Sequence, residues 1–192
     1  TLRVCIGTPV TLEDESILDP AGTGATLDSL SVIWGDGSRT KRVDQNDQSH
    51  NYSTADTFTV EWIVFSAAAP SPQCSDTTTR VIVVGAALSV AITQTNSIDC
   101  NGDGDGELTG TITGGTSTYN YDWGTTLDGT EVEDVAPTAS LTNVQSSLGP
   151  DDYFLTVTDA NGCIAKDTET IDQPAALSVA ITQTNSIDCN GD

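Results

Sequence analysis

The pattern with the clearest chemical potential is an acidic, glycine-rich stretch near the middle of the chain. Oxygen-bearing side chains recur there at every second position, and they are Asp99, Asn101, Asp103, Asp105 and Glu107. Such a loop could wrap a hard cation, so it predicts a Ca²⁺ site. It is not an EF-hand, because Gly110 occupies the position that needs a bidentate Glu. The alternative is a solvated turn whose Asp and Asn side chains cap their own backbone.

A second candidate is a set of alternating aromatic residues. Tyr119, Tyr121 and Trp123 could form an exposed platform for a sugar ring. Alternation along strands favours positions in the hydrophobic core for Trp34, Trp62 and Trp123, and the sugar platform is the alternative.

Two further polar residues have structural interpretations. Asp36 lies between two glycines and could be a metal ligand, but this pattern is typical of a tight turn capped by the Asp. His50 is the only histidine, and the sequence places no Ser and Asp around it in a recognisable catalytic order. We therefore predict that the protein is not an enzyme.

The five cysteines are Cys5, Cys74, Cys100, Cys163 and Cys189. The simplest pairing is Cys5–Cys74 and Cys100–Cys163, with the partner of Cys189 beyond residue 192. Each bridge would stabilise its domain by roughly 4 kcal/mol in the chain-entropy model. Such pairing predicts an oxidising, extracellular location, and buried free thiols are the alternative. The absence of CxxC or His/Cys clusters argues against zinc.

Composition excludes several classes of partner. The 192 residues include 28 acidic and 6 basic side chains, giving a net charge of -22. Such a surface repels nucleic acid and anionic lipid, and no apolar run is long enough to insert into a membrane. The start lacks Met and resembles no signal peptide, so we expect a piece of a larger mature protein.

An internal repeat organises the chain. Residues 86–103 and 175–192 both read AALSVAITQTNSIDCNGD, at an offset of 89 residues. We therefore predict domains at 1–85 and 86–174, and the truncated first strand of a further repeat at 175–192. Only a few small residues link them, so neighbouring domains should stack end to end as a rod.

The elements that must position these residues are strands. Apolar and polar residues alternate over 58–64, 88–92 and 153–157, residues 80–84 are continuously apolar after Arg80, and Gly, Asn and Asp punctuate the runs. No stretch has helical period and length. The sequence predicts an all-β protein made of tandem immunoglobulin-like antiparallel β-sandwiches arranged as a rod.

The first domain resembles a PKD domain, an immunoglobulin-like module of surface proteins and secreted enzymes. The residues that carry the likeness are Trp34-Gly35-Asp36-Gly37-Ser38, His50-Asn51-Tyr52, Phe58, Val60, Trp62 and Val64. Asp56 and Phe58 stand where that family usually has Gly and Tyr. The resemblance implies a structural, hydrogen-bonding role for His50.

The second domain resembles the SprB repeat, named for a giant gliding adhesin of Bacteroidetes. The matching residues are Cys100-Asn101-Gly102, Asp105-Gly106, Thr113-Gly114-Gly115, Tyr119 to Trp123 and Tyr153 to Cys163. An acidic insertion around 125–134 departs from the pattern. The resemblance implies a long fibre displayed on the cell surface and exported by the type IX secretion system.

The resemblance to Bacteroidetes surface proteins makes Ser29 and Thr77 candidate O-glycosylation sites. Each follows Asp and precedes Leu or Thr, as in the signal that Bacteroidetes use for this modification.

Together these features predict a structural repeat module of a secreted adhesive filament that serves gliding or attachment. Its partners would be neighbouring repeats, other copies of the filament and an unidentified surface or glycan. No cofactor other than Ca²⁺ is expected. The alternatives are a module that itself binds glycan or protein, and a spacer in a secreted hydrolase.

Overall fold

The chain is all-β where the structure, a computed structural model, describes it: residues 1–13, 27–42, 46–66, 74–125 and 131–184. These residues form fourteen strands and no helix, so they contain no helical segment that could cross a membrane. The strands are β1 Leu2–Cys5, β2 Val10–Leu12, β3 Leu27–Ile33, β4 Arg39–Arg42, β5 Gln48–His50, β6 Thr57–Ser66, β7 Ser75–Gly85, β8 Leu88–Asn96, β9 Gly106–Gly114, β10 Tyr119–Gly124, β11 Glu131–Thr138, β12 Thr142–Leu148, β13 Asp151–Asp159 and β14 Ile164–Ile171. The predicted alternating runs lie within β6, β8 and β13, which confirms the strand pattern.

The first sandwich comprises β1 to β7. Its larger sheet has the order β1-β7-β6-β3-β4, and β2 pairs with β5 in a second, two-stranded sheet. All pairings are antiparallel except that of β1 with β7, which is parallel and places Cys5 opposite Gly85. Apolar side chains from both sheets, including the fully buried Trp34 and Val10, form one core.

The second sandwich comprises β8 to β14. One sheet has the order β11-β10-β13-β14 and the other β12-β9-β8. Their inward side chains form a separate core around Trp123, Leu108 and Leu155. Asp167 of β14 accepts a hydrogen bond from the backbone N–H of Ile92 in β8 at 2.7 Å, which ties the two sheets together along one edge.

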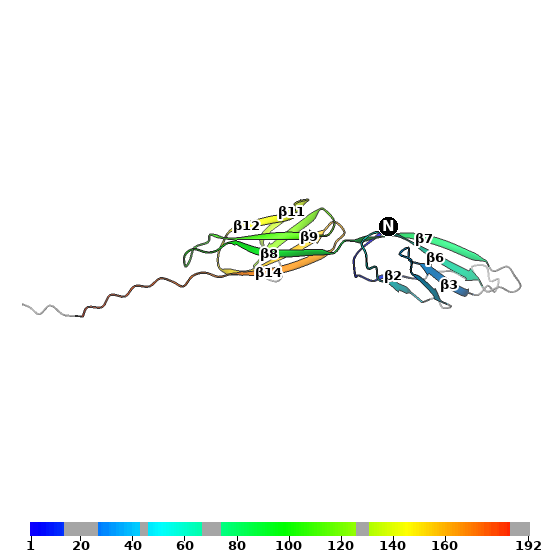
Figure 1. Cartoon of the computed structure of the whole chain (residues 1–192), viewed down its shortest axis with the longest axis horizontal. Coiled ribbons are helices and arrows are strands. Elements are labelled where there is room, and N and C mark those ends of the chain that lie inside the picture. Colours follow the sequence, from blue (N-terminus) through cyan, green and yellow to red (C-terminus); the bar gives the residue numbers. More distant parts are fainter. Residues whose placement is uncertain (14–26, 43–45, 67–73, 126–130, 185–192) are drawn as a thin grey trace, which may run out of the picture.

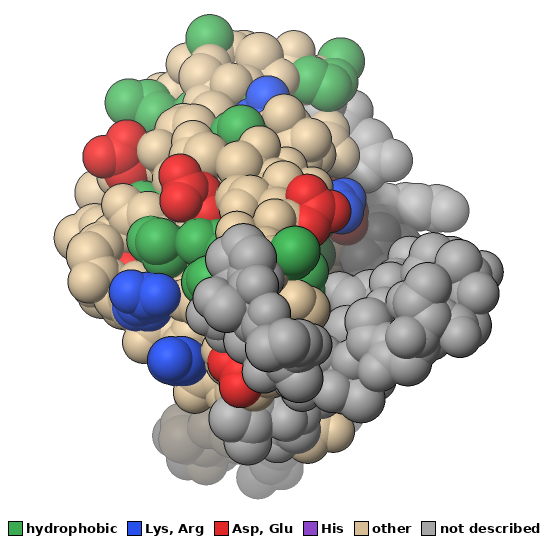
Figure 2. All heavy atoms as spheres, turned by 90° about the vertical axis from the view of Figure 1, so that its right-hand side faces the viewer, with side chains coloured by type: hydrophobic (Ala, Val, Ile, Leu, Met, Phe, Trp, Pro, Cys, Tyr) green, Lys and Arg blue, Asp and Glu red, His purple; other side chains and the backbone are tan. Residues whose placement is uncertain are grey.

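The two sandwiches meet at a short connection. Only Ala86 and Ala87 separate β7 from β8, and the two bodies lie one after the other along the long axis of the molecule (Figure 1). Five of the six basic residues belong to the first sandwich, and Figure 2 shows Lys and Arg side chains among acidic ones on its end. The second sandwich has Lys166 as its only basic residue and is strongly acidic.

The second copy of the repeated sequence has a different structure from the first. Residues 175–184 contain no strand, and 185–192, which include Cys189, lie outside the described residues. Ile92 of β8 is buried at 7% exposure, whereas its counterpart Ile181 is 94% exposed. The predicted start of a further repeat at 175–192 stays a prediction, since residues 175–184 are the only part of it that the structure describes.

Candidate functional site at the junction of the two sandwiches

A disulfide bond joins the two sandwiches. The Cys5 sulfur at the end of β1 bonds to that of Cys163, which directly precedes β14, with the two Cα atoms 5.6 Å apart. The bond links residues 158 positions apart and crosses the junction. Both predicted pairings, Cys5–Cys74 and Cys100–Cys163, are therefore wrong, whereas the presence of a disulfide is confirmed.

The length of β7 explains why Cys5 does not bond to Cys74. Cys5 lies opposite Gly85, the last residue of this 11-residue strand, whereas Cys74 directly precedes its first residue, Ser75. At about 3.3 Å per residue, the two cysteines are roughly 36 Å apart along the strand. A disulfide requires Cα atoms within about 7 Å.

A similar separation excludes a bond between Cys100 and Cys163. Cys163 precedes the first residue of β14, whereas the loop that carries Cys100 contacts Gln173, beyond the end of that strand. The eight residues of β14 span about 25 Å. The Cys100 thiol is exposed at the far end of the second sandwich.

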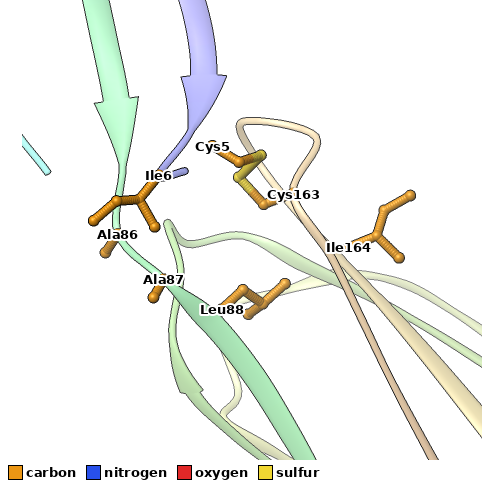
Figure 3. A pocket seen from close by; sticks show the side chains of 7 residues that line it. All are labelled: Cys5, Ile6, Ala86, Ala87, Leu88, Cys163 and Ile164. Atoms are coloured by element: carbon orange, nitrogen blue, oxygen red, sulfur yellow. A yellow bond between two sulfur atoms is a disulfide. The ribbon is translucent and has the colours of Figure 1, made fainter. Parts of the chain in front are cut away.

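A small pocket lies beside the disulfide, between the two bodies (Figure 3). It has a volume of about 190 Å³, and its lining consists of Cys5, Ile6, Ala86, Ala87, Leu88, Cys163 and Ile164. The lining side chains are apolar apart from the disulfide itself, so they offer no acid, base or metal ligand. The pocket is therefore a feature of how the sandwiches meet and not a reaction site.

A buried carboxylate shapes the turn that presents Cys163. Asp159 is 5% exposed, and its Oδ1 accepts hydrogen bonds from the backbone N–H groups of Asn161 at 2.9 Å and Cys163 at 2.8 Å. Its Oδ2 accepts another from Thr116 N–H at 2.8 Å. Gly162 completes the turn with a φ of 84°, a conformation that glycine adopts without strain.

Asn161, on the same turn, connects the two sandwiches by a polar contact. Its Oδ1 accepts a hydrogen bond from Arg3 Nη1 at 2.7 Å, and its Nδ2 donates to Thr116 Oγ1 at 2.9 Å. The side chain also lies against Gly85, where an added Cβ would come within 2.7 Å of Nδ2. Among the described residues, the junction is thus held by the backbone, the Cys5–Cys163 disulfide and the exposed hydrogen bond between Arg3 and Asn161.

Replacing Asp159 with Asn should loosen this turn. The amide group cannot accept all three N–H bonds, so we expect the free energy of unfolding to fall by about 2 kcal/mol. The disulfide should also react faster with dithiothreitol. Both quantities can be measured by denaturant unfolding and timed thiol labelling, with the exposed Asp151→Asn as control. An unchanged reduction rate with lowered stability would contradict the role of Asp159 in holding Cys163.

The polar side chains of the acidic stretch make hydrogen bonds to their surroundings. Asn101 Nδ2 donates to Pro174 O, Glu107 Oε1 accepts from Thr95 Oγ1, and Asp105 Oδ1 accepts from Asp99 N–H. Within the described residues, no three His, Cys, Asp or Glu side chains converge as a metal site would require. Calcium binding by this stretch therefore stays a prediction, with the solvated turn as its alternative.

The aromatic platform is also corrected. Tyr119, Tyr121 and Trp123 are 4%, 0% and 0% exposed. Trp123 Nε1 donates to Asn143 Oδ1 at 2.8 Å, and the two tyrosine hydroxyls donate to backbone carbonyls. Burial raises the pKa of Tyr121 to about 12, with a smaller contribution from Tyr119. Side chains alternate between the two faces of β10, and the three rings are on the face that packs against the core.

The two proposed glycosylation residues differ in accessibility. Ser29 is 4% exposed and its hydroxyl donates to Asp28, so the prediction for Ser29 is wrong: its side chain is buried, on the face of β3 opposite to the core residues Leu30 and Val32. Thr77 lies exposed on β7. Modification of Thr77 remains a prediction.

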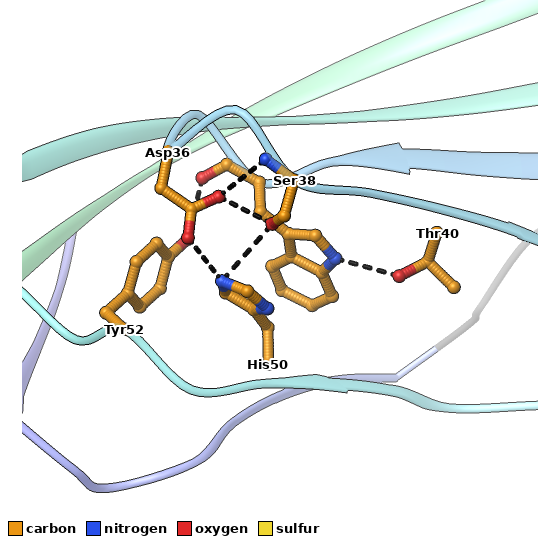
Figure 4. A network of polar contacts seen from close by, with 6 residues as sticks. Asp36, Ser38, Thr40, His50 and Tyr52 are labelled. Carbon is orange, nitrogen blue, oxygen red and sulfur yellow. Dashed lines mark hydrogen bonds and ion pairs between the residues drawn. The ribbon is translucent and has the colours of Figure 1, made fainter.

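The Gly-Asp-Gly motif forms the predicted capped turn (Figure 4). Asp36 Oδ1 accepts from Ser38 N–H at 3.0 Å and from its hydroxyl at 2.5 Å, while Asp36 Oδ2 lies 2.6 Å from His50 Nε2. Gly35 has a φ of 84°, and a Cβ there would meet Thr59 O at 2.7 Å. Only glycine fits this position, which confirms the turn interpretation.

The same residues do not form a catalytic triad. In a Ser-His-Asp triad the carboxylate and the hydroxyl contact different ring nitrogens. Here Asp36 and Ser38 both approach His50 Nε2, and the Ser38 hydroxyl donates to the carboxylate. His50 is further held between Trp34, stacked at 4.8 Å, and Tyr52, edge-on at 4.7 Å. This arrangement braces the turn.

We expect the turn to be sensitive to acid. Slight burial opposes ionisation of Asp36, but hydrogen bonds from Ser38 and the contact with His50 lower its pKa to about 2. Because this pKa is below the unfolded value, the stabilisation is complete above about pH 4 and is lost as pH falls toward 2. Asp36→Asn should cost about 1 kcal/mol at pH 7, after allowance for solvent screening. Thermal unfolding between pH 2 and 7 should show the difference vanishing near pH 2; Asp47→Asn is the control.

Sequence reasoning missed the contacts between the sandwiches. The signal available was the position of the cysteines: Cys5 precedes the first turn of its domain, and Cys163 and Cys100 lie near opposite ends of the repeat. Cysteines at the ends of domains can bond across a junction as well as within a domain. The sequence does not give the direction of β1 along β7, so it could not distinguish a bond across the junction from a bond within one domain.

Comparisons with known proteins yield only distant structural similarity. No protein-family model matches the chain, and no curated protein sequence does. Among solved structures, the C-terminal 282-residue fragment of intimin, in complex with the intimin-binding domain of its translocated receptor, is 12% identical over 77% of this chain, with a TM-score of 0.41. The N-terminal eight Ig domains of Down syndrome cell adhesion molecule are 14% identical over 89%, with a TM-score of 0.35.

A third structure is the ectodomain (Ig1–Ig3) of mouse nectin-like molecule 4, which is 16% identical over 89% of this chain, with a TM-score of 0.31. The chain spans 53% of the intimin fragment, 21% of the eight-domain structure and 66% of the mouse ectodomain. All three TM-scores are below 0.5, and none of these similarities assigns the chain to a family or a function.

Proposed function

We propose that the chain is a structural module of a secreted, cell-surface adhesive filament, in which immunoglobulin-like sandwiches stack as a rod and carry tension. The observation that carries the proposal is the Cys5–Cys163 bond across the junction. The exact repeat of residues 86–103 at 175–192 supports a tandem arrangement. The disulfide itself favours an oxidising, extracellular location.

The disulfide changes the path that a pulling force takes. A force applied to the two chain ends enters at Cys5, crosses the sulfur–sulfur bond to Cys163 and continues along β14. Residues 6–162 lie in a closed loop outside this path, so the load cannot extend them while the disulfide is intact. A module that carries tension would benefit from such shielding, whereas a simple flexible spacer would not need it.

The surface charge and the described side chains fit a passive role. The acidic second sandwich would keep adjacent filaments soluble and apart. The only Ser-His-Asp contact in the described residues has the geometry of a structural brace. We therefore propose a non-enzymatic protein, and the resemblances to PKD and SprB modules favour export by the type IX system and a role in gliding or attachment.

The two alternatives are less well supported. A glycan-binding role through Tyr119, Tyr121 and Trp123 would require rings that are buried here to face solvent. A spacer in a secreted hydrolase would carry a catalytic domain elsewhere in the same polypeptide. The mass of the native polypeptide distinguishes this alternative from the proposed filament, because a filament of many repeats is far larger than one enzyme with a stalk.

Single-molecule force spectroscopy tests the proposal on the chain held at both ends. Under reducing conditions, complete unfolding should release the 158-residue loop, about 550 Å of extended chain. Under oxidising conditions that length should be absent, and only the residues outside the loop should extend. Cys100→Ser, which leaves the junction intact, should behave like the original chain. Equal extension with and without reductant would contradict the load path.

A further inference from the structure

The second sandwich has a cysteine at each of its ends. Cys163 is at the end that meets the first sandwich, where it is bonded to Cys5. Cys100 is at the opposite end, with its thiol exposed. Since the two are separated by the length of β14, they cannot bond to each other in this fold.

The loop that carries Cys100 is fixed against the linker that leads out of the sandwich. Asn101 Nδ2 donates to Pro174 O at 3.0 Å, and Gly102 N–H donates to Gln173 Oε1 at 2.8 Å. Asp103 N–H donates to Cys100 O at 3.1 Å, which closes the turn. Cys100 therefore has a defined position beside residues 173–174.

This position matches that of Cys5 at the first junction. Cys5 lies opposite Gly85, and the repeat offset of 89 residues makes Pro174 the equivalent of Gly85. Each outgoing linker thus has a cysteine beside it, and each linker is followed by Ala-Ala and the sequence of β8. At the first junction, the cysteine beside the linker bonds to Cys163 of the sandwich that follows.

We propose that Cys100 forms a disulfide with the counterpart of Cys163 in a following copy of the repeat. The inference rests on the proposed function, since it requires a tandem array. The partner surface is the turn equivalent to residues 159–163, which Asp159 holds in shape through bonds internal to each repeat. Cys189, the counterpart of Cys100, would make the same bond one repeat further on.

Formation of the bond is a two-electron oxidation. The two thiols lose two protons and two electrons to an external disulfide, such as an oxidised protein dithiol or oxidised glutathione, which is reduced to two thiols. The Cys100 thiol is exposed, so it is accessible to this exchange.

One feature of the second junction differs from the first. Gly85 lies against Asn161 Nδ2, and Pro174 has a side chain in the place of that glycine. The contact involves the end of a flexible side chain, so the Asn161 counterpart must rotate away from Pro174. The second junction should therefore depend on its disulfide more than the first, where Arg3 also bonds to Asn161.

The bonds together would form overlapping covalent loops. Cys5–Cys163 encloses Cys100, so the next bond starts inside the first loop and ends beyond it. Because successive loops overlap, every junction of the array is crossed by both the backbone and a disulfide. The filament would then resist extension at each junction without a continuous hydrophobic interface.

Disulfide mapping of a longer chain tests the proposal. The 192 residues are extended by a second copy of residues 104–174, which completes the second repeat. Two substitutions distinguish peptides that would otherwise be identical in the two repeats. Cys189→Ser leaves Cys100 as the only cysteine of its peptide sequence, and Val at the position equivalent to Ile164 marks the added copy of the Cys163 peptide. The chain is folded in a glutathione redox buffer, alkylated and digested with a protease that cleaves before Asp. We expect the Cys100 peptide linked to the Val-marked peptide, beside the Cys5–Cys163 link.

The Cys5–Cys163 link serves as the measure of correct folding. In the Cys100→Ser variant of the extended chain, this link should persist. The cysteine that corresponds to Cys163 in the added repeat should then have no partner, and its thiol should be alkylated. An alkylated Cys100 in a chain that retains Cys5–Cys163 would overturn the inference and leave the proposed function intact. A link from Cys100 to the unmarked Cys163 would overturn both this inference and the load path at the first junction.

Discussion

Replacing Cys5 with Ser should have the largest effect on stability of any substitution at the junction. The disulfide closes a loop of 158 residues, and the chain-entropy model gives a loss of about 5 kcal/mol in the free energy of unfolding. We further expect the two sandwiches, which have separate cores, to unfold in two transitions once the bond is absent. Differential scanning calorimetry of oxidised Cys5→Ser protein measures both effects.

The matched control is Cys100→Ser, because the Cys100 thiol is exposed and forms no disulfide within the described residues. It should leave the melting temperature within about 1 °C of the original, as is usual for surface substitutions. Reduction of the original chain should reproduce Cys5→Ser. A Cys5→Ser protein as stable as the original would show that the junction disulfide does not constrain the unfolded chain.

Substitution of Trp123 by Ala should cost about 3–5 kcal/mol, the usual range for removing a buried aromatic side chain. The ring is 0% exposed and in contact with Leu155 and the neighbouring backbone at Gly110, where an added Cβ would lie 2.5 Å from Leu155 and 3.0 Å from the ring. Its N–H bond to Asn143 would also be lost. We expect only the transition of the second sandwich to shift, as measured by calorimetry on the Cys5→Ser background.

Trp34→Ala provides the comparison, since Trp34 is equally buried in the first sandwich and should shift the other transition. The pair also tests the glycan-binding alternative. A Trp123→Ala protein that lost binding to a glycan array without any loss of stability would contradict the buried position of the ring. Loss of stability alone is the expected result.

Much of the local structure follows from the sequence. The alternation from Phe58 to Val64 defines a half-buried strand because side chains point to opposite faces at every step. The Gly35-Asp36-Gly37 turn follows from the need for positive φ on both sides of a capping carboxylate. The order of the sheets and the sites on them did not follow: whether Tyr121 and Trp123 faced solvent depended on which face of β10 met the second sheet.

The cysteines and the repeat show what only the tertiary structure decided. The sequence established where the cysteines are, but their pairing depended on β1 running parallel to β7, which brings Cys5 to the junction. Nine of the 18 repeated residues form β8 in the first copy, where β9 supplies the hydrogen bonds and a core buries Ile92. In the other copy, the described residues 175–184 form no strand. A strand requires a partner for its backbone and a core for its apolar face, and both come from outside the segment.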